Sequence, residues 1–202
     1  YRSNRNILSA TEVDTIIADL EMEESVHYGV GFEKYLNEQL LLKAEVFYKD
    51  YTGVGVNSVD NYPERLMLND GYGRAKGFEL MIQQLSGGPI EGWLTYTYSK
   101  SERHDLDGWY SPDYDVEHSV NLFGSYNLSK TSKITLATKW STGRPYTPVL
   151  GQQVNESGDV EYSEGDRFSE RFGDYFRLDI WFEKDGAEVM IPIPFLPSEH
   201  KF

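Results

Sequence analysis

The clearest candidates for chemistry are the carboxylates of an acidic loop that runs from Asp105 to Asp115. Such a group of aspartates could bind a divalent cation, because Ca²⁺ prefers oxygen ligands. The spacing does not fit an EF-hand loop, since Trp109 and Tyr110 stand where an oxygen ligand and the sharp-turn glycine belong. We therefore predict a solvated loop and no metal site. A loose surface site for a divalent ion is the alternative.

The chain has four histidines and no cysteine. Disulfides and thiolate chemistry are therefore excluded, and the histidines do not occur at metal-ligand spacings. His104 lies beside Asp105 and is the one group that could activate a water molecule. The sequence also lacks the Gly-x-Ser-x-Gly elbow of many hydrolases. We predict no catalytic residue and no cofactor, and a hydrolase built on His104 is the least favoured alternative.

A glycine-rich stretch from Gly71 to Gly77 has a superficial likeness to a phosphate-binding loop. A dinucleotide-binding loop follows a strand and opens a helix, whereas this stretch leads into an alternating pattern typical of a strand. We expect these glycines to let the chain bend or a loop descend. The net charge of −14 also argues against nucleic acid as a partner.

Seven stretches alternate apolar and polar residues with a period of two, which predicts strands with two different faces. The only helix-like pattern lies before them, and residues 1–24 are expected to form a loop or a short helix that leads into the strands. The apolar series are Val26 to Phe32, Leu42 to Tyr48, Phe78 to Ile82, Leu94 to Tyr98, Val120 to Leu128, Ile134 to Trp140 and Phe176 to Phe182.

The connections between these strands alternate in length. Short turns are predicted at residues 36–39, 86–89 and 129–132, and long loops are predicted at Thr52–Tyr72, Arg103–Asp115 and Gly143–Gly173. Short turns at one end and long loops at the other are typical of a transmembrane β-barrel of the outer membrane. We therefore predict an all-β, antiparallel transmembrane β-barrel, with residues 25–184 forming seven barrel strands.

The two faces of the predicted strands differ as a membrane barrel requires. One face is apolar and carries aromatic residues near both ends, as expected of the girdles at the two membrane interfaces. The other face holds mainly polar residues, which suits a wet lumen. The girdle nearer the long loops contains Tyr28, Tyr48, Phe78, Tyr98, Trp140 and Phe176, and the other contains Phe32, Tyr126 and Phe182.

The long loops combine acidic side chains with aromatic rings and arginines, so they are the predicted place of ligand binding. A cationic chelate, a glycan or a peptide could bind there, or a surface lipoprotein could dock as a lid. The sequence alone does not separate these ligand classes. The candidate ligand-binding residues are Arg103, Trp109, Tyr110, Tyr114, Arg144 and Tyr146.

Several segments, in this order, give the chain a resemblance to a known family. From about Glu24 to Lys184 it resembles the C-terminal part of a TonB-dependent outer-membrane receptor of the kind common in Bacteroidetes. The segments are 24–34, 43–50, 73–80, 92–101, 118–122, 141–148 and 175–180, and each is a weak strand signature by itself.

The resemblance implies a 22-stranded barrel filled by an N-terminal plug, of which this chain would supply about the last third. It also implies uptake of a scarce ligand across the bacterial outer membrane, driven by the TonB system through a plug domain that this chain does not contain. Outer-membrane lipid, the TonB system and possibly a surface lipoprotein are the implied partners. A small self-contained barrel with a structural or adhesion role is the main alternative.

The pattern departs from the family at residues 185–202. Three prolines, Pro192, Pro194 and Pro197, occur there, and the segment is too short for the two strands and the loop that the family would supply. We expect an incomplete C-terminal barrel segment, in which residues are missing around Lys184–Asp185 and near Ser198 or ordered pieces have been joined. The chain is expected to be a processed protein or a piece of a longer one.

Overall fold

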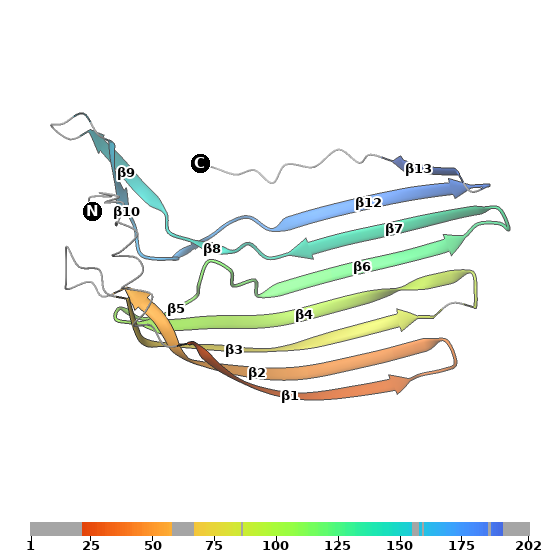
Figure 1. The fold of residues 1–202 in the computed structure, drawn as a ribbon. Helices are drawn as coiled ribbons and strands as arrows, with labels where there is room; N and C mark the ends of the chain where they lie inside the picture. The colour runs from red at the N-terminus through yellow and green to blue at the C-terminus, as the bar shows by residue number, and fades with distance from the viewer. Residues whose placement is uncertain are drawn as a thin grey trace.

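A computed structural model describes residues 22–57, 67–85, 87–154, 158, 160–185 and 187–191 of the chain. It consists of one large antiparallel sheet and two small ribbons at the end where the long loops lie (Figure 1). The order in the large sheet is β1-β2-β3-β4-β6-β7-β12-β13, and the short strand β5 pairs with β4. No helix long and apolar enough to cross a membrane occurs among the described residues.

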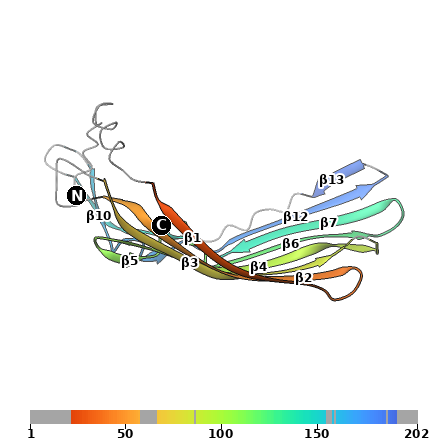
Figure 2. The same cartoon turned by 60° about the horizontal axis from the view of Figure 1, so that its bottom comes forward.

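Seven long strands occupy the seven stretches that alternate in the sequence, and each pairs with its neighbour in an antiparallel register. All-β antiparallel architecture is therefore confirmed. Figure 2 shows that the long strands are bent rather than straight, so the sheet curves. The strands are β1 (Glu24–Tyr35), β2 (Leu40–Asn57), β3 (Met67–Gln84), β4 (Ile90–Asp105), β6 (His118–Asn127), β7 (Ser132–Ser141) and β12 (Tyr175–Lys184).

The apolar face of this sheet is exposed along most of its length. Val30 and Val46 are directly opposite each other on β1 and β2, and their exposed fractions are 78% and 64%. Only four hydrophobic side chains are buried in the described part of the chain, namely Leu41, Val54, Val56 and Ala75. The burial of so few hydrophobic side chains does not stabilise the sheet in water, so its apolar face needs an apolar environment.

Aromatic contacts follow the predicted girdle near the long loops. The rings of Tyr28 and Tyr48 lie 6.4 Å apart, and those of Phe78 and Tyr98 lie 5.8 Å apart. Each pair is directly opposite in register on neighbouring strands. Cross-strand aromatic pairs of this kind stabilise a sheet face.

The glycine-rich stretch forms part of β3 and gives room to side chains of β2. A Cβ at Gly77 would collide with the backbone of Tyr98 and would lie 2.8 Å from the Phe47 ring. Phe47 and Gly77 are register partners, so the ring lies across the glycine. These glycines therefore allow aromatic side chains to pack onto the sheet and form no phosphate-binding loop.

The predicted loop Thr52–Tyr72 is wrong over most of its described length. Pairing continues to Asn57↔Met67, with register shifts near Val54, and residues 58–66 lie outside the described part. Val54 and Val56 are 2% and 7% exposed, so the strand pattern continues. The alternating glycines at 53 and 55 hid this continuation in the sequence.

The other two predicted long loops also contain strands. In the loop Arg103–Asp115, β4 continues to Asp105 and forms a hairpin with β5 (Gly108–Tyr110). The loop Gly143–Gly173 contains two ribbons: β8 (Pro145–Tyr146) pairs with β11 (Glu170–Arg171), and β9 (Val149–Val154) pairs with β10 (Val160–Glu164). Strands this short carry too little periodicity to be found from the sequence.

Lys184 of β12 pairs with Ala187 of β13 (Ala187–Ile191), and the expected loss of residues around Lys184–Asp185 stays a prediction. Asp185 has a φ of 52°, and Asp-Gly is the preferred sequence for such a hairpin turn. Most of residues 1–24, and residues 192–202, lie outside the described part, so those predictions stay predictions.

Candidate ligand-facing rim

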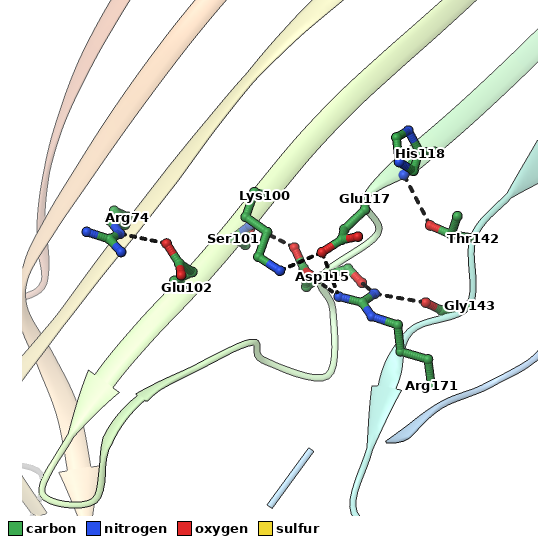
Figure 3. A network of polar contacts seen from close by, with 10 residues as sticks. All are labelled: Arg74, Lys100, Ser101, Glu102, Asp115, Glu117, His118, Thr142, Gly143 and Arg171. Carbon is green, nitrogen blue, oxygen red and sulfur yellow. Dashed lines mark hydrogen bonds and ion pairs between the residues drawn. The ribbon is translucent and has the colours of Figure 1, made fainter. Parts of the chain in front are cut away.

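The end of the sheet where the long loops lie, here called the rim, contains a network of charged side chains centred on Asp115 (Figure 3). The Asp115 side chain has no exposed surface. Its Oδ1 accepts a hydrogen bond of 2.7 Å from the Ser101 backbone N–H, and its Oδ2 accepts one of 2.6 Å from Arg171 Nη2. A buried carboxylate is stable only when paired and hydrogen-bonded, and both conditions are met here.

Arg171 joins three segments of the chain through the same guanidinium group. Its Nη1 donates to the carbonyl oxygens of Asp115 at 3.2 Å and of Gly143 at 3.0 Å. Its Nη2 also donates to Glu117 Oε1 at 3.2 Å. Arg171 therefore fixes the segment around β11 onto the connection between β5 and β6.

Glu117 completes the network by accepting a hydrogen bond from Lys100 Nζ of β4. This hydrogen bond is the main reason why the pKa of the Glu117 carboxyl lies below its ordinary value, against the opposing effect of desolvation. The Glu117 backbone also takes part, because the Ser99 N–H donates to its carbonyl oxygen at 3.0 Å. The network therefore holds the start of β6 against the outer part of β4.

The structure brings together three of the predicted ligand-binding residues, Arg103, Tyr114 and Tyr110, because Tyr110 of β5 is the register partner of Arg103. Arg103 Nε donates a hydrogen bond of 2.6 Å to the Tyr114 hydroxyl, and the guanidinium carbon lies 5.7 Å from the Tyr114 ring centroid. Half of Tyr114 is exposed. Arg103 lies on the polar face, because it is the register partner of Gly73 on that face.

Tyr110 also contacts two residues that the sequence did not single out. The Arg167 guanidinium lies 3.9 Å from the Tyr110 ring centroid, and Phe168 stacks on the same ring at 5.7 Å. Arg167 also pairs with Asp105 and donates a 3.0 Å hydrogen bond to the Tyr110 hydroxyl. Burial raises the pKa of the Tyr110 phenol.

Trp109 lies apart from these residues, on the side that continues the apolar face. It pairs with His104, and the two rings are 5.2 Å apart. The Arg74 guanidinium lies 4.3 Å from the Trp109 ring centroid, and Arg74 also pairs with Glu102 at 2.7 Å. Trp109 therefore faces outward from the sheet, not toward Arg103 and Tyr110.

Arg144 and Tyr146, the last two predicted residues, lie in the segment around β8. Tyr146 stacks on Phe172 with ring centroids 4.4 Å apart. The Arg144 carbonyl oxygen accepts a 3.0 Å hydrogen bond from the Phe172 N–H, and the residue is exposed. Of the six predicted residues, Arg103, Tyr110 and Tyr114 thus lie together, Arg144 and Tyr146 lie around β8, and Trp109 faces outward.

The sequence prediction missed Tyr51, Arg167, Phe168, Arg171 and Phe172. Arg171 contacts residues that are 54 to 56 positions away in the chain, which no local pattern reveals. Tyr51 could have been found by extending the period of two on β2 beyond Lys49, since it continues the polar face. For metals, no group of three or more His, Asp or Glu residues in the described ranges could hold an ion.

Comparisons with known proteins agree with this geometry. Residues 2–180 match the family model described as TonB-dependent receptor-like, beta-barrel, and no curated protein matches the chain. The ferric-catecholate import receptor Fiu of E. coli K12 aligns with a TM-score of 0.58 at 17% identity, over 81% of this chain and 21% of that chain.

Two other solved receptors share the fold. The FrpB iron transporter of Neisseria meningitidis gives a TM-score of 0.57 at 16% identity, over 83% of this chain and 25% of that chain. The pyoverdine receptor FpvA of Pseudomonas aeruginosa gives 0.61 at 15% identity, over 83% and 24%. The chain thus spans about a quarter or less of the length of these receptors.

Proposed function

Because this chain belongs to the TonB-dependent receptor β-barrel family, we propose that it forms part of the wall and rim of a receptor that takes up a scarce ligand through the outer membrane. The TonB system supplies the energy in this proposal. The observation that carries it is the division of one sheet into an exposed apolar face and a polar face, with a hydrogen-bonded rim at one end of the strands. Lipid covers the first face, and the second lines the lumen.

The polar face supports contact with a plug domain. Glu45 and Glu79 are directly opposite each other on β2 and β3, and both are exposed. Neither carboxylate pairs with a cation within the described part of the chain. Like charges in this arrangement destabilise a sheet, so we propose that the plug presents a positively charged side chain to them.

The ribbon formed by β9 and β10 supports a surface lipoprotein as a further partner. Leu150, Val154 and Tyr162 project from one side of this ribbon and are 71%, 69% and 57% exposed. An exposed apolar patch of this kind marks a site of protein interaction. We propose that a lipoprotein lid docks there.

The proposed function involves no covalent chemistry. The His104 ring packs between the rings of Tyr72 and Trp109, and in the described ranges it makes no hydrogen bond to a carboxylate. A general base needs such a partner or a free path to substrate. This geometry favours a binding protein over the alternative of a hydrolase that uses His104.

Uptake by whole cells tests the proposal. A strain that carries the full-length receptor is grown on iron chelates, glycans or peptides as the limiting nutrient, with and without a functional TonB system. We expect one class to support growth only when both receptor and TonB are present. Growth that requires the receptor but not TonB would contradict energised uptake, and turnover that is lost in His104→Ala would favour the hydrolase.

A further inference from the structure

A cavity of about 200 Å³, here called the rim slot, lies on the polar face at the rim. Drug-sized ligands occupy pockets of about 300–1,000 Å³, so the rim slot suits one ring or one terminal group of a larger ligand. Its walls come from β2, β3, β4 and the connection between β5 and β6. Among the lining residues are Tyr51, Gly73, Ala75, Ser101, Arg103 and Tyr114.

The slot exists because Gly73, which has no side chain, interrupts a row of side chains. Tyr51, Gly73 and Arg103 are register partners across β2, β3 and β4, so they form one row on the same face. A Cβ at Gly73 would lie 3.3 Å from Tyr51 Cβ and 3.4 Å from Tyr51 Cδ2. The floor is therefore backbone at Gly73, with the small side chain of Ala75 beside it.

Arg103 supplies hydrogen-bond donors to this slot. Its Nε is bound to the Tyr114 hydroxyl, which fixes the orientation of the guanidinium plane. Within the described part of the chain, the only partner of its Nη atoms is Glu23 Oε1, at 3.7 Å from Nη2. That distance is too long for a hydrogen bond, so the Nη donors are available to a ligand.

We propose that the rim slot binds a six-membered ring that carries a carboxylate, with the ring beside Tyr51 and the carboxylate on the Nη atoms of Arg103. A planar guanidinium binds a carboxylate through two parallel hydrogen bonds, and a tyrosine ring stacks on an aromatic ring or on the C–H face of a sugar. Glu23 lies close to Arg103, so a group with one negative charge is favoured over a doubly charged phosphate.

This inference rests on the proposed function, since it names the chemistry of the ligand at the same rim. An aromatic hydroxy acid and a sugar acid share that chemistry. The test uses 2-hydroxybenzoate for the first source and glucuronate for the second, with benzamide as an uncharged ring. Binding of each to the purified full-length receptor is measured by saturation-transfer NMR and by calorimetry.

We expect at least one of the two acids to bind and benzamide to bind more weakly. Arg103→Lys keeps the charge but loses the planar fork, so it should weaken acid binding about tenfold or more. Gly73→Val fills the slot and should abolish binding. The matched controls are Lys76→Gln, an exposed cation on the other face of β3, and Gly31→Val, on the polar face of β1 where a Cβ meets only the Ala44 carbonyl oxygen at 3.8 Å.

Each outcome decides between the alternatives. Binding of neither acid, equal binding of benzamide, or unchanged binding in both Arg103→Lys and Gly73→Val would overturn the inference. Loss of binding in the two control variants would also overturn it, because the loss would then not come from the slot. TonB-dependent growth without binding of either acid would reject the slot and leave the proposed function intact. Arg103-dependent binding without any TonB-dependent growth would reject the proposed function and leave the rim slot intact.

Discussion

The half of the sheet near the short turns and the half near the rim are stabilised by different interactions. Near the short turns, charged side chains pair and stay partly exposed, as Lys43 does with Glu33 on the neighbouring strand at 2.7 Å. At the rim, Asp115 is fully buried and Arg171 reaches it from a segment more than fifty residues away. The barrel half can therefore form strand by strand, whereas the rim requires several loops to meet.

This difference has a functional consequence. A regular two-faced sheet tolerates polar changes on its lumen side, because water or plug surface replaces lost contacts. A rim held by one guanidinium is more easily disturbed as a unit, since several hydrogen bonds depend on the same side chain. Loops that carry the candidate binding residues are in this way held in place by polar contacts.

The largest expected effect is at Arg171. Arg171→Ala leaves the buried Asp115 carboxylate without its cation, which costs about 3–5 kcal/mol for a buried pair. Arg177→Ala removes the analogous arginine from the pair with Asp179 on the barrel half, where the arginine side chain is 60% exposed, and should have a much smaller effect. Hydrogen exchange of β4, β6 and β11 in the full-length receptor compares the two. Equal effects would show that the rim network is not the stronger of the two.

The next effect is expected on the barrel half and depends on the face. Val46→Arg or Leu136→Arg, on the apolar face, should cost about 2–4 kcal/mol, because a charge near the middle of a bilayer is poorly solvated. Thr95→Arg, on the lumen side, should cost much less. Folding into lipid vesicles, followed by denaturant titration, measures all three. If both faces tolerated arginine equally, the assignment of the apolar face to lipid would be wrong.

A smaller effect should appear with pH at the rim. The folded-state pKa of Glu117 is lowered, so its contribution to stability is fully present above its ordinary value of 4.5 and is lost as the pH falls through the lowered value. Exchange protection of β6 should therefore be constant near neutral pH and should fall only below 4.5. Glu117→Gln removes this titration, and a wild-type pH profile in that variant would assign it to another group.

The sequence predicted the barrel half well and the rim poorly, for a physical reason. A period of two over ten residues, as in β7 or β12, identifies a strand and its two faces without knowledge of its neighbours. The two-residue strands β8 and β11 have no period, and their positions are set by Arg171 and by stacking of Tyr146 on Phe172. The Asp-Gly turn at residue 185 was a local signal that pattern reasoning should have found.

The candidate site divides in the same way. Arg103 and Tyr114 are close together because the register of β3 and β4 places Arg103 opposite Gly73, on the lumen side. Trp109 is one residue before Tyr110, and its side chain therefore points to the other face of the hairpin. Alternation within β5 was not visible to a prediction that treated residues 103–115 as one loop.

The smallest effect on stability is expected for removal of the β9–β10 ribbon. Gly165 N–H donates a 2.8 Å hydrogen bond to the Pro148 carbonyl oxygen, so the two ends of the ribbon are already adjacent. A short Gly-Ser turn in place of Val149–Glu164 keeps this closure and should change the free energy of unfolding by less than about 1 kcal/mol. Uptake should fall, because the ribbon carries the exposed apolar side that we propose as a docking site.

A longer deletion, from Val149 to Arg167, serves as the contrast. It also removes the guanidinium that pairs with Asp105 and covers the Tyr110 ring, so it should destabilise the rim as well as reduce uptake. Assembly in the outer membrane and uptake are measured in the same strains for both deletions. A short deletion that fails to assemble would mean that the ribbon is a structural element of the rim. Normal uptake after the short deletion would mean that the ribbon has no part in capturing a ligand or a lid.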